Sequence, residues 1–128
     1  MTTRDVLFLI ICSVALKCFP QCLPPTTIFP SNTNYYNTEL NWNTVPEAHF
    51  YKIRYKIVGT GNWSFQNNID STLNSKLITN LTPLSDYVWQ IRSYCDSSGG
   101  LNSNWSLTDT FTTTTNNYPE PNTLFTTS

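Results

Sequence analysis

The stretch from Leu81 to Cys95 constrains the fold of this chain more than any other part of the sequence. From residue 87 onward it alternates with the period of two that a half-buried β-strand requires. One side of the alternation carries Tyr87, Trp89, Ile91, Ser93 and Cys95, and the other carries Val88, Gln90, Arg92 and Tyr94. We therefore expect this segment to be a central strand of a β-sandwich.

The first half of the same stretch has the spacing Leu-x-Pro-x-x-x-Tyr, formed by Leu81, Pro83 and Tyr87. This is the spacing of a tyrosine corner, in which a Tyr at the start of a strand hydrogen-bonds back to the backbone of the preceding turn. The motif predicts how the strand begins and carries no chemistry of its own.

The rest of the sequence fits one sandwich. Its 128 residues are 39% hydrophobic and 14% aromatic, enough for a single core. Only 12% are charged and the net charge is -1, so no broad field favours nucleic acid or an anionic membrane surface. Turn residues separate seven candidate antiparallel strands, at 22–30, 38–43, 51–57, 63–66, 73–79, 87–95 and 105–113. The alternation predicts that Leu40, Trp42, Tyr51, Ile53, Tyr55 and Ile57 face inward.

Residues 1–21 are predicted to be a signal peptide. Arg4 precedes an apolar run over 6–16, which is shorter than the about 20 residues needed to span a bilayer. The alternatives are a buried N-terminal strand and a lipid anchor on Cys18. We expect a secreted or cell-surface domain over 22–114, followed by a Thr/Asn/Pro-rich linker or disordered tail over 115–128.

The pattern over residues 22–114 resembles a fibronectin type III domain, an all-β, immunoglobulin-like sandwich. The resemblance rests on Leu40, Trp42, Tyr51, Ile53, Tyr55, Leu81, Pro83, Tyr87 and Ile91. The run Tyr-x-Ile-Arg-Tyr-Lys, the following Gly-Thr-Gly-Asn-Trp and the Cys that ends the central strand look most like modules in secreted and surface proteins of Bacteroidetes-type bacteria. The resemblance implies a non-catalytic module for protein or glycan binding, adhesion or domain spacing, with a larger multidomain protein as one setting.

Cysteine usage fits export. After removal of the signal peptide two cysteines remain, Cys22 and Cys95, an even pair in an oxidising compartment. In this fold the start of the first strand and the end of the central strand can lie at the same end of the sandwich, so we expect a disulfide. The alternatives are two free thiols or a metal site, but two Cys and the distant His49 do not supply a tetrahedral set of ligands.

No catalytic constellation stands out in the sequence. The only histidine, His49, lies at a strand entrance away from any nucleophile motif. The carboxylates fall on different strands or turns, at Glu39, Glu47, Asp70, Asp86, Asp96 and Asp109. We expect no enzyme activity, no metal and no cofactor.

Basic residues are few but concentrated. Of the seven Lys and Arg residues, Arg4 and Lys17 lie in the predicted signal peptide. Four of the remaining five should project from the outer face of the sheet built on 51–57 and 87–95, namely Lys52, Arg54, Lys56 and Arg92. Arg92 is placed to stack on Trp105, and Trp63 and Tyr94 border the same surface. This face is either a binding face for an acidic glycan or protein, or a self-contained cation–π ladder that stiffens the sheet.

Asn104-Trp105-Ser106 resembles half of the Trp-Ser-x-Trp-Ser signature of class I cytokine receptors, which are built from the same type of domain. The first Trp-Ser is read as missing, with Leu101-Asn102-Ser103 in its place. This resemblance implies an alternative function, a receptor-like ectodomain fragment that binds a protein ligand. Asn62, Asn80 and Asn104 also begin N-glycosylation sequons.

Overall fold

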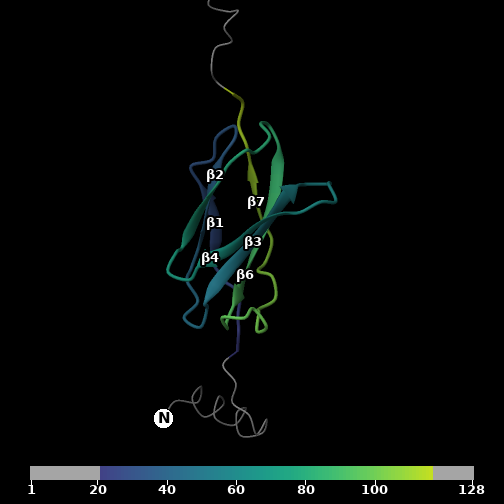
Figure 1. The fold of residues 1–128 in the computed structure, drawn as a ribbon. Coiled ribbons are helices and arrows are strands. Elements are labelled where there is room, and N and C mark those ends of the chain that lie inside the picture. Colours follow the sequence, from purple (N-terminus) through teal and green to yellow (C-terminus); the bar gives the residue numbers. More distant parts are fainter. Residues whose placement is uncertain (1–20, 117–128) are drawn as a thin grey trace, which may run out of the picture.

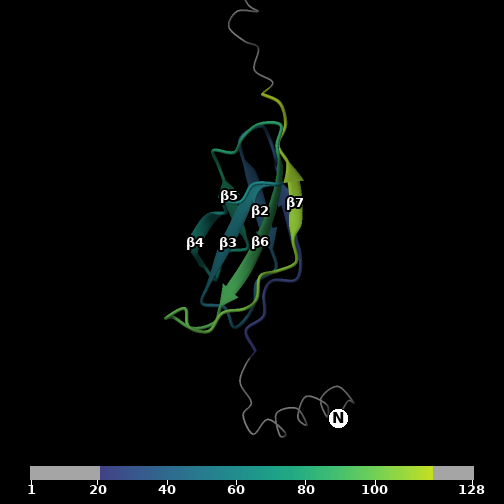
Figure 2. The same ribbon diagram turned by 90° about the vertical axis from the view of Figure 1, so that its right-hand side faces the viewer.

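The computed structural model describes residues 21–116, which form two antiparallel sheets packed face to face (Figures 1 and 2). The strands are β1 (Ile28–Ser31), β2 (Thr38–Trp42), β3 (Phe50–Ile57), β4 (Ser64–Asp70), β5 (Ser75–Ile78), β6 (Asp86–Tyr94) and β7 (Asp109–Thr112). One sheet has the order β1-β2-β5 and the other β4-β3-β6-β7. The predicted seven-stranded sandwich is confirmed. Almost all of the predicted signal peptide and most of the predicted tail lie outside the described residues.

The core lies between β3 and β6 of the larger sheet and the facing strand β2. The two long strands β3 and β6 pair in register from Phe50 opposite Tyr94 to Ile57 opposite Tyr87. Their inward side chains are fully buried at Tyr51, Ile53, Trp89 and Ile91, as is Leu40 on β2. The predicted alternation is therefore confirmed, although Tyr55 and Ile57 are only partly buried.

Two strands are shorter than the sequence predicts. The first begins at Ile28 rather than at residue 22, because Pro24 and Pro25 have no N–H to donate to a ladder. The last begins at Asp109 rather than at residue 105. The preceding segment still runs beside β6. There, however, two backbone N–H groups of β6 donate to serine hydroxyls, whereas in a regular ladder they would donate to backbone carbonyls. β1 does lie at a sheet edge, as its prolines predict.

The tyrosine corner and the disulfide are both present. The Tyr87 hydroxyl accepts a hydrogen bond from the Thr82 N–H at 2.9 Å, which fixes the turn before β6. Cys22 and Cys95 are bonded, with their Cα atoms 5.8 Å apart, and this ties the N-terminal segment to the end of β6. The predicted disulfide is confirmed.

The chain enters and leaves the domain at opposite ends. In Figure 1 the purple segment that begins at residue 21 joins the sandwich at one end, and the yellow segment that reaches residue 116 leaves at the other. The disulfide lies at the entrance, and the tyrosine corner lies near the exit, where the Leu84 N–H bonds the Thr114 carbonyl at 3.2 Å. Segments joined to the two ends of the domain would therefore be separated by about the length of the domain.

A candidate ligand face of stacked cations and aromatic rings

Four basic side chains lie on the outer face of the larger sheet, as the alternation predicts. Lys52, Arg54 and Lys56 come from β3, and Arg92 comes from β6. The pairing places Lys52 directly opposite Arg92, while Arg54 lies opposite Gln90. Alternate residues on a strand are about 6.6–6.8 Å apart along its axis, so the three β3 cations form an evenly spaced row.

The cations stack with aromatic rings in a continuous series that we call the cation–π ladder. The Arg54 guanidinium lies between two indoles, 4.3 Å from the ring centroid of Trp63 and 4.3 Å from that of Trp105. Arg92 covers Trp105 at 4.4 Å, and Lys56 covers Trp63 at 4.7 Å. The order is therefore Lys56, Trp63, Arg54, Trp105 and Arg92. Each indole faces two cations, and the sequence predicted only the contact between Arg92 and Trp105.

A separate pair continues the face beyond the ladder. Lys52 lies 4.6 Å from the ring centroid of Phe65, an exposed residue of β4. Phe50 and Tyr94 stack in parallel at the end of the same face, with centroids 4.6 Å apart. The sequence placed Tyr94 on this face but missed Phe50 and Phe65. Their place on the face follows only from the register of β3 with its neighbours, in which Phe65 of β4 lies opposite Arg54 and Phe50 lies opposite Tyr94 of β6.

Two serines position Trp105 over the sheet. The Ser103 hydroxyl accepts the Ser93 N–H at 2.9 Å, and the Ser106 hydroxyl accepts the Ile91 N–H at 3.0 Å. The backbone N–H groups of Ser103 and Ser106 return bonds to the carbonyls of the same two β6 residues at 2.9 and 2.8 Å. Both serines are buried, so these bonds are shielded from water. The chain between the two serines is pinned at two points, and Trp105 lies between those points.

This arrangement corrects the comparison with the Trp-Ser-x-Trp-Ser signature. Asn102-Ser103-Asn104-Trp105-Ser106 matches it in four of the five positions, because Ser103 takes the place of the first serine and Asn104 is the variable residue. Only the first Trp is replaced, by Asn102. The earlier interpretation that the first Trp-Ser pair is missing was wrong, and the spacing of three between the two serines was the available signal.

Gln90 connects the ladder to the same segment. Its side-chain oxygen accepts from Arg54 Nε at 3.0 Å and from Arg54 Nη2 at 2.6 Å, while its Nε2 donates to the Ser106 carbonyl at 2.8 Å. Arg54 is thus held by a neutral amide rather than by a carboxylate. Burial, followed by the nearby Arg92 charge, lowers the pKa of Arg54 from its ordinary value, although an arginine stays protonated at physiological pH.

The positive charge of this face is not neutralised by acidic side chains. Within residues 21–116, none of the four cations forms an ion pair with a carboxylate. Arg92 Nε is buried without a hydrogen-bond partner, so ring stacking rather than a polar contact holds this guanidinium. Like charges placed directly opposite each other, as Lys52 and Arg92 are, destabilise a sheet. The face therefore keeps a net positive charge, and the repulsion between Lys52 and Arg92 destabilises the sheet when no ligand is bound.

Other predicted site residues lie away from this face or form no site. The Cys22–Cys95 disulfide and the tyrosine corner occupy opposite ends of the sandwich. His49 is exposed just before β3, where its N–H bonds the Tyr94 carbonyl at 2.7 Å. In the part of the chain that the structure describes, no three His, Cys, Asp or Glu side chains gather closely enough to hold a metal ion. No helix within residues 21–116 has the length and apolar character to cross a membrane.

The arrangement of four strands on three, with β6 internal and opened by a tyrosine corner, is that of an immunoglobulin-like sandwich. The sequence matches no protein-family model and no curated protein sequence. Solved structures of fibronectin type III domains are nevertheless similar to it. A domain of human collagen XX has a TM-score of 0.62 at 20% identity, with 75% of this chain and 99% of that chain covered.

A two-domain segment of chicken tenascin gives a TM-score of 0.66 at 17% identity, covering 73% of this chain and 51% of that segment. The three-domain FN1–FN3 segment of chicken CNTN1 gives 0.65 at 19% identity, covering 75% and 32%. These similarities show that the chain has the fibronectin type III fold. At such identities they show the fold alone, so function must be argued from the surface of this chain.

Proposed function

We propose that this chain is a non-catalytic extracellular module that binds an acidic partner through the cationic outer face of the larger sheet and spaces neighbouring segments along a chain. The observation that carries the proposal is the group of four cations on this face, the three of the ladder and the neighbouring Lys52, each stacked on an aromatic ring and without a carboxylate partner within residues 21–116. The partner class is an acidic glycan or an acidic protein surface. The Cys22–Cys95 disulfide supports export, since such bonds persist in oxidising compartments.

Stacking supports binding because it prepares the face before a ligand arrives. A free Arg or Lys side chain loses rotamer entropy of about 0.5–1.5 kcal/mol when a ligand immobilises it. Arg54 is already immobilised by two indoles and by Gln90. The ladder and the ligand face, which the sequence offered as alternatives, are therefore compatible.

Retention on an immobilised polyanion tests the proposal. The exported protein would be applied to heparin and to alginate resins, which present sulfate and carboxylate groups respectively, and eluted with a salt gradient. Lys52→Glu reverses one charge of the face and should elute at clearly lower salt than the wild type. Lys76→Glu makes the same change on β5 of the other sheet and is the matched control. Equal elution of the two variants would reject binding through this face.

A receptor-like ectodomain for a protein ligand is the second candidate. The observation that favours it is the paired-serine segment around Trp105, which matches the cytokine-receptor signature in all but one position. The complete gene provides the test. A second sandwich domain beside this one, together with a membrane-spanning segment, would support the receptor function, and their absence from the complete gene would count against it.

A further inference from the structure

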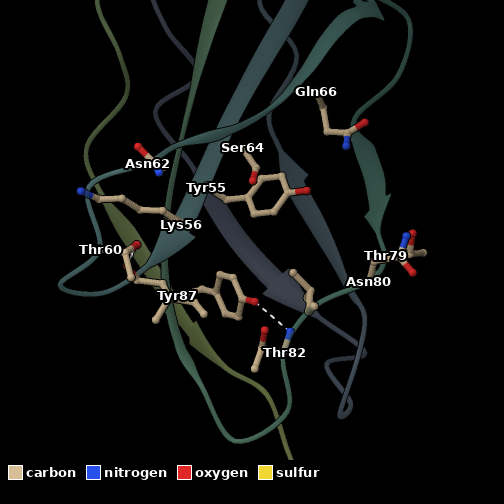
Figure 3. Close-up of a pocket in the computed structure, with 12 residues that line it drawn as sticks. Tyr55, Lys56, Thr60, Asn62, Ser64, Gln66, Thr79, Asn80, Thr82 and Tyr87 are labelled. Atoms are coloured by element: carbon tan, nitrogen blue, oxygen red, sulfur yellow. Dashed lines mark hydrogen bonds between the residues drawn. The ribbon is translucent and has the colours of Figure 1, made fainter.

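A second surface lies where the two sheets open between β4 and β5, on a different side of β3 from the ladder. Figure 3 shows this cleft, which has a volume of about 430 Å³. Its inner part is formed by aromatic and aliphatic groups that include the partly buried Tyr55 and the buried Tyr87. Its outer part is polar and includes Asn62, Ser64 and Gln66. The cleft thus combines an aromatic base with an uncharged polar rim.

The polar groups of the rim are not used by the protein itself. Within residues 21–116, the side chains of Asn62, Ser64, Gln66 and Asn80 make no hydrogen bond, and neither does the Tyr55 hydroxyl. Figure 3 shows these side chains distributed around the cleft, with the Tyr55 ring between Ser64 and Tyr87. Each amide side chain supplies both a donor and an acceptor, and each hydroxyl supplies either. The rim therefore offers several unused donors and acceptors around one cavity.

Several asparagines elsewhere on the surface behave differently. Asn34 accepts hydrogen bonds from the backbone of its own turn, and Asn43 accepts two from the N-terminal segment before β1. Asn41 donates to the Ser31 hydroxyl at 2.9 Å. These amides stabilise turns and strand pairs, a structural role that the amides of the cleft do not have. Their chemistry is available to a ligand.

The backbone that carries the rim is already fixed. The β3–β4 hairpin is closed by the Thr60 N–H and hydroxyl, which both bond the Ile57 carbonyl, at 3.1 and 2.7 Å. The opposite side is anchored where the Leu81 N–H bonds the Tyr36 carbonyl at 2.9 Å. A ligand would meet a preformed cleft and would not have to order a loop.

We propose that this cleft is a binding subsite for an uncharged sugar, one pyranose unit of a neutral oligosaccharide. A pyranose has an apolar C–H face that packs on an aromatic ring, and its hydroxyls both donate and accept hydrogen bonds. The cleft supplies Tyr55 for the first and the amides and hydroxyls of its rim for the second. Its only charged lining residue is Lys56, whose Nζ is already stacked on Trp63. Its volume lies within the range of ligand pockets, about 300–1,000 Å³.

This subsite does not depend on the proposed acidic partner. Binding to the ladder should weaken as salt rises, because it is ionic, whereas binding of a neutral sugar should be nearly insensitive to salt. The two surfaces share only Lys56. Failure of one proposal therefore leaves the other to be judged by its own measurement.

The test is a titration of the ¹⁵N-labelled exported protein with three neutral sugars, N,N′,N″-triacetylchitotriose, cellotriose and maltotriose, followed by NMR. Asn62 and Asn80 begin sequons, so the protein is made without N-glycans. We expect saturable shifts of the side-chain amides of Asn62, Gln66 and Asn80 with at least one sugar, unchanged when salt is raised. Gln66→Ala should weaken this binding about tenfold, the effect of losing one hydrogen bond of ordinary strength.

Asn67→Ala is the matched control, since residue 67 is the next residue of β4 and does not line the cleft. Ser64→Trp should fill the cleft and abolish binding, while Gln66→Ala keeps the test valid if that bulky variant does not fold. No saturable shift with any of the three sugars would overturn the proposal. Equal losses in Gln66→Ala and Asn67→Ala, or shifts confined to the ladder, would overturn it as well.

Discussion

The stacking of Trp105 is the contact of the ladder that lends itself best to measurement. Its indole faces Arg54 at 4.3 Å and Arg92 at 4.4 Å, and it is only partly buried. Trp105→Leu keeps an apolar side chain but removes the ring, so it should cost mainly the two cation–π contacts. An exposed contact of this kind contributes about 0.5–1 kcal/mol. We therefore expect the free energy of unfolding to fall by about 1–2 kcal/mol.

Arg92 isolates one of these contacts. Unlike Arg54, it stacks on a single ring within residues 21–116, and its Nε has no hydrogen-bond partner. Arg92→Met retains most of the apolar stem and removes the charge. A double-mutant cycle between Arg92→Met and Trp105→Leu should give a coupling free energy of about 0.5–1 kcal/mol, the value of one exposed cation–π pair.

Urea unfolding followed by far-UV circular dichroism measures each corner of the cycle. The midpoint should shift while the slope m stays constant, because the surface exposed on unfolding changes little. The control cycle pairs Trp105→Leu with Lys76→Met on the other sheet, where no coupling is expected. If the coupling free energy of the Arg92 cycle is no larger than that of the Lys76 cycle, the contact between Arg92 and Trp105 does not contribute to stability and the reasoning is refuted.

Three further predictions concern the rest of the domain. Cys22→Ser should lower the free energy of unfolding by about 4 kcal/mol in the chain-entropy model, since the bond closes a loop with a sequence separation of 73; urea midpoints compared with those of the chemically reduced wild type would show whether loss of the bond accounts for the effect. Tyr87→Phe removes the hydroxyl that accepts the Thr82 N–H and should cost about 1–3 kcal/mol in the same assay, with an unchanged midpoint counting against the tyrosine corner. A loop amide bonded to its carboxylate lowers the pKa of Asp96, so its contribution to stability is present at neutral pH and is lost as the pH falls below about 4. Asp96→Asn should therefore flatten the acid limb of a plot of urea midpoint against pH, and an identical limb would contradict the prediction.

The parts of the fold that repeat along the sequence could be predicted from it. The alternation in β3 and β6 determines which side chains are buried, so the inward Tyr51 and Trp89 and the outward Arg54 followed directly. The even pair of cysteines determined the disulfide once export was inferred. These inferences needed only the local periodicity of the sequence and the inference that the protein is exported to an oxidising compartment.

The parts that depend on how segments approach one another could not be predicted. The sequence placed Trp63 at the border of the cationic face, but its stacking over Arg54 follows from the β3–β4 register, in which Arg54 pairs with Phe65. The start of the last predicted strand was misplaced because Ser103 and Ser106 replace backbone acceptors with side-chain ones in the preceding segment. The periodicity of a sequence does not show that serine hydroxyls will replace backbone carbonyls as hydrogen-bond acceptors.

The cleft could not be predicted from the sequence for a different reason. Its lining comes from β3, β4, the β3–β4 hairpin, the segment after β5 and the start of β6. It exists because β4 and β5 are edge strands of different sheets that do not pair. Alternation predicts that Tyr55 points inward, but it does not show that the two sheets part where Tyr55 lies. Such an opening is a property of sheet edges, which only the three-dimensional arrangement reveals.

Stability and binding should separate cleanly on the cationic face. Stacking uses the flat face of a guanidinium, so N–H groups on its edge stay available for an anion, except Arg54 Nε and Nη2, which bond Gln90, and Arg92 Nε, which is buried. Trp105→Leu should therefore lower both stability and retention on a polyanion, because it loosens two cations at once. Lys52→Glu should lower retention alone, since its new carboxylate lies opposite Arg92 and relieves a repulsion between like charges. A variant pair that lost stability and retention in constant proportion would mean that the face acts only by stiffening the sheet.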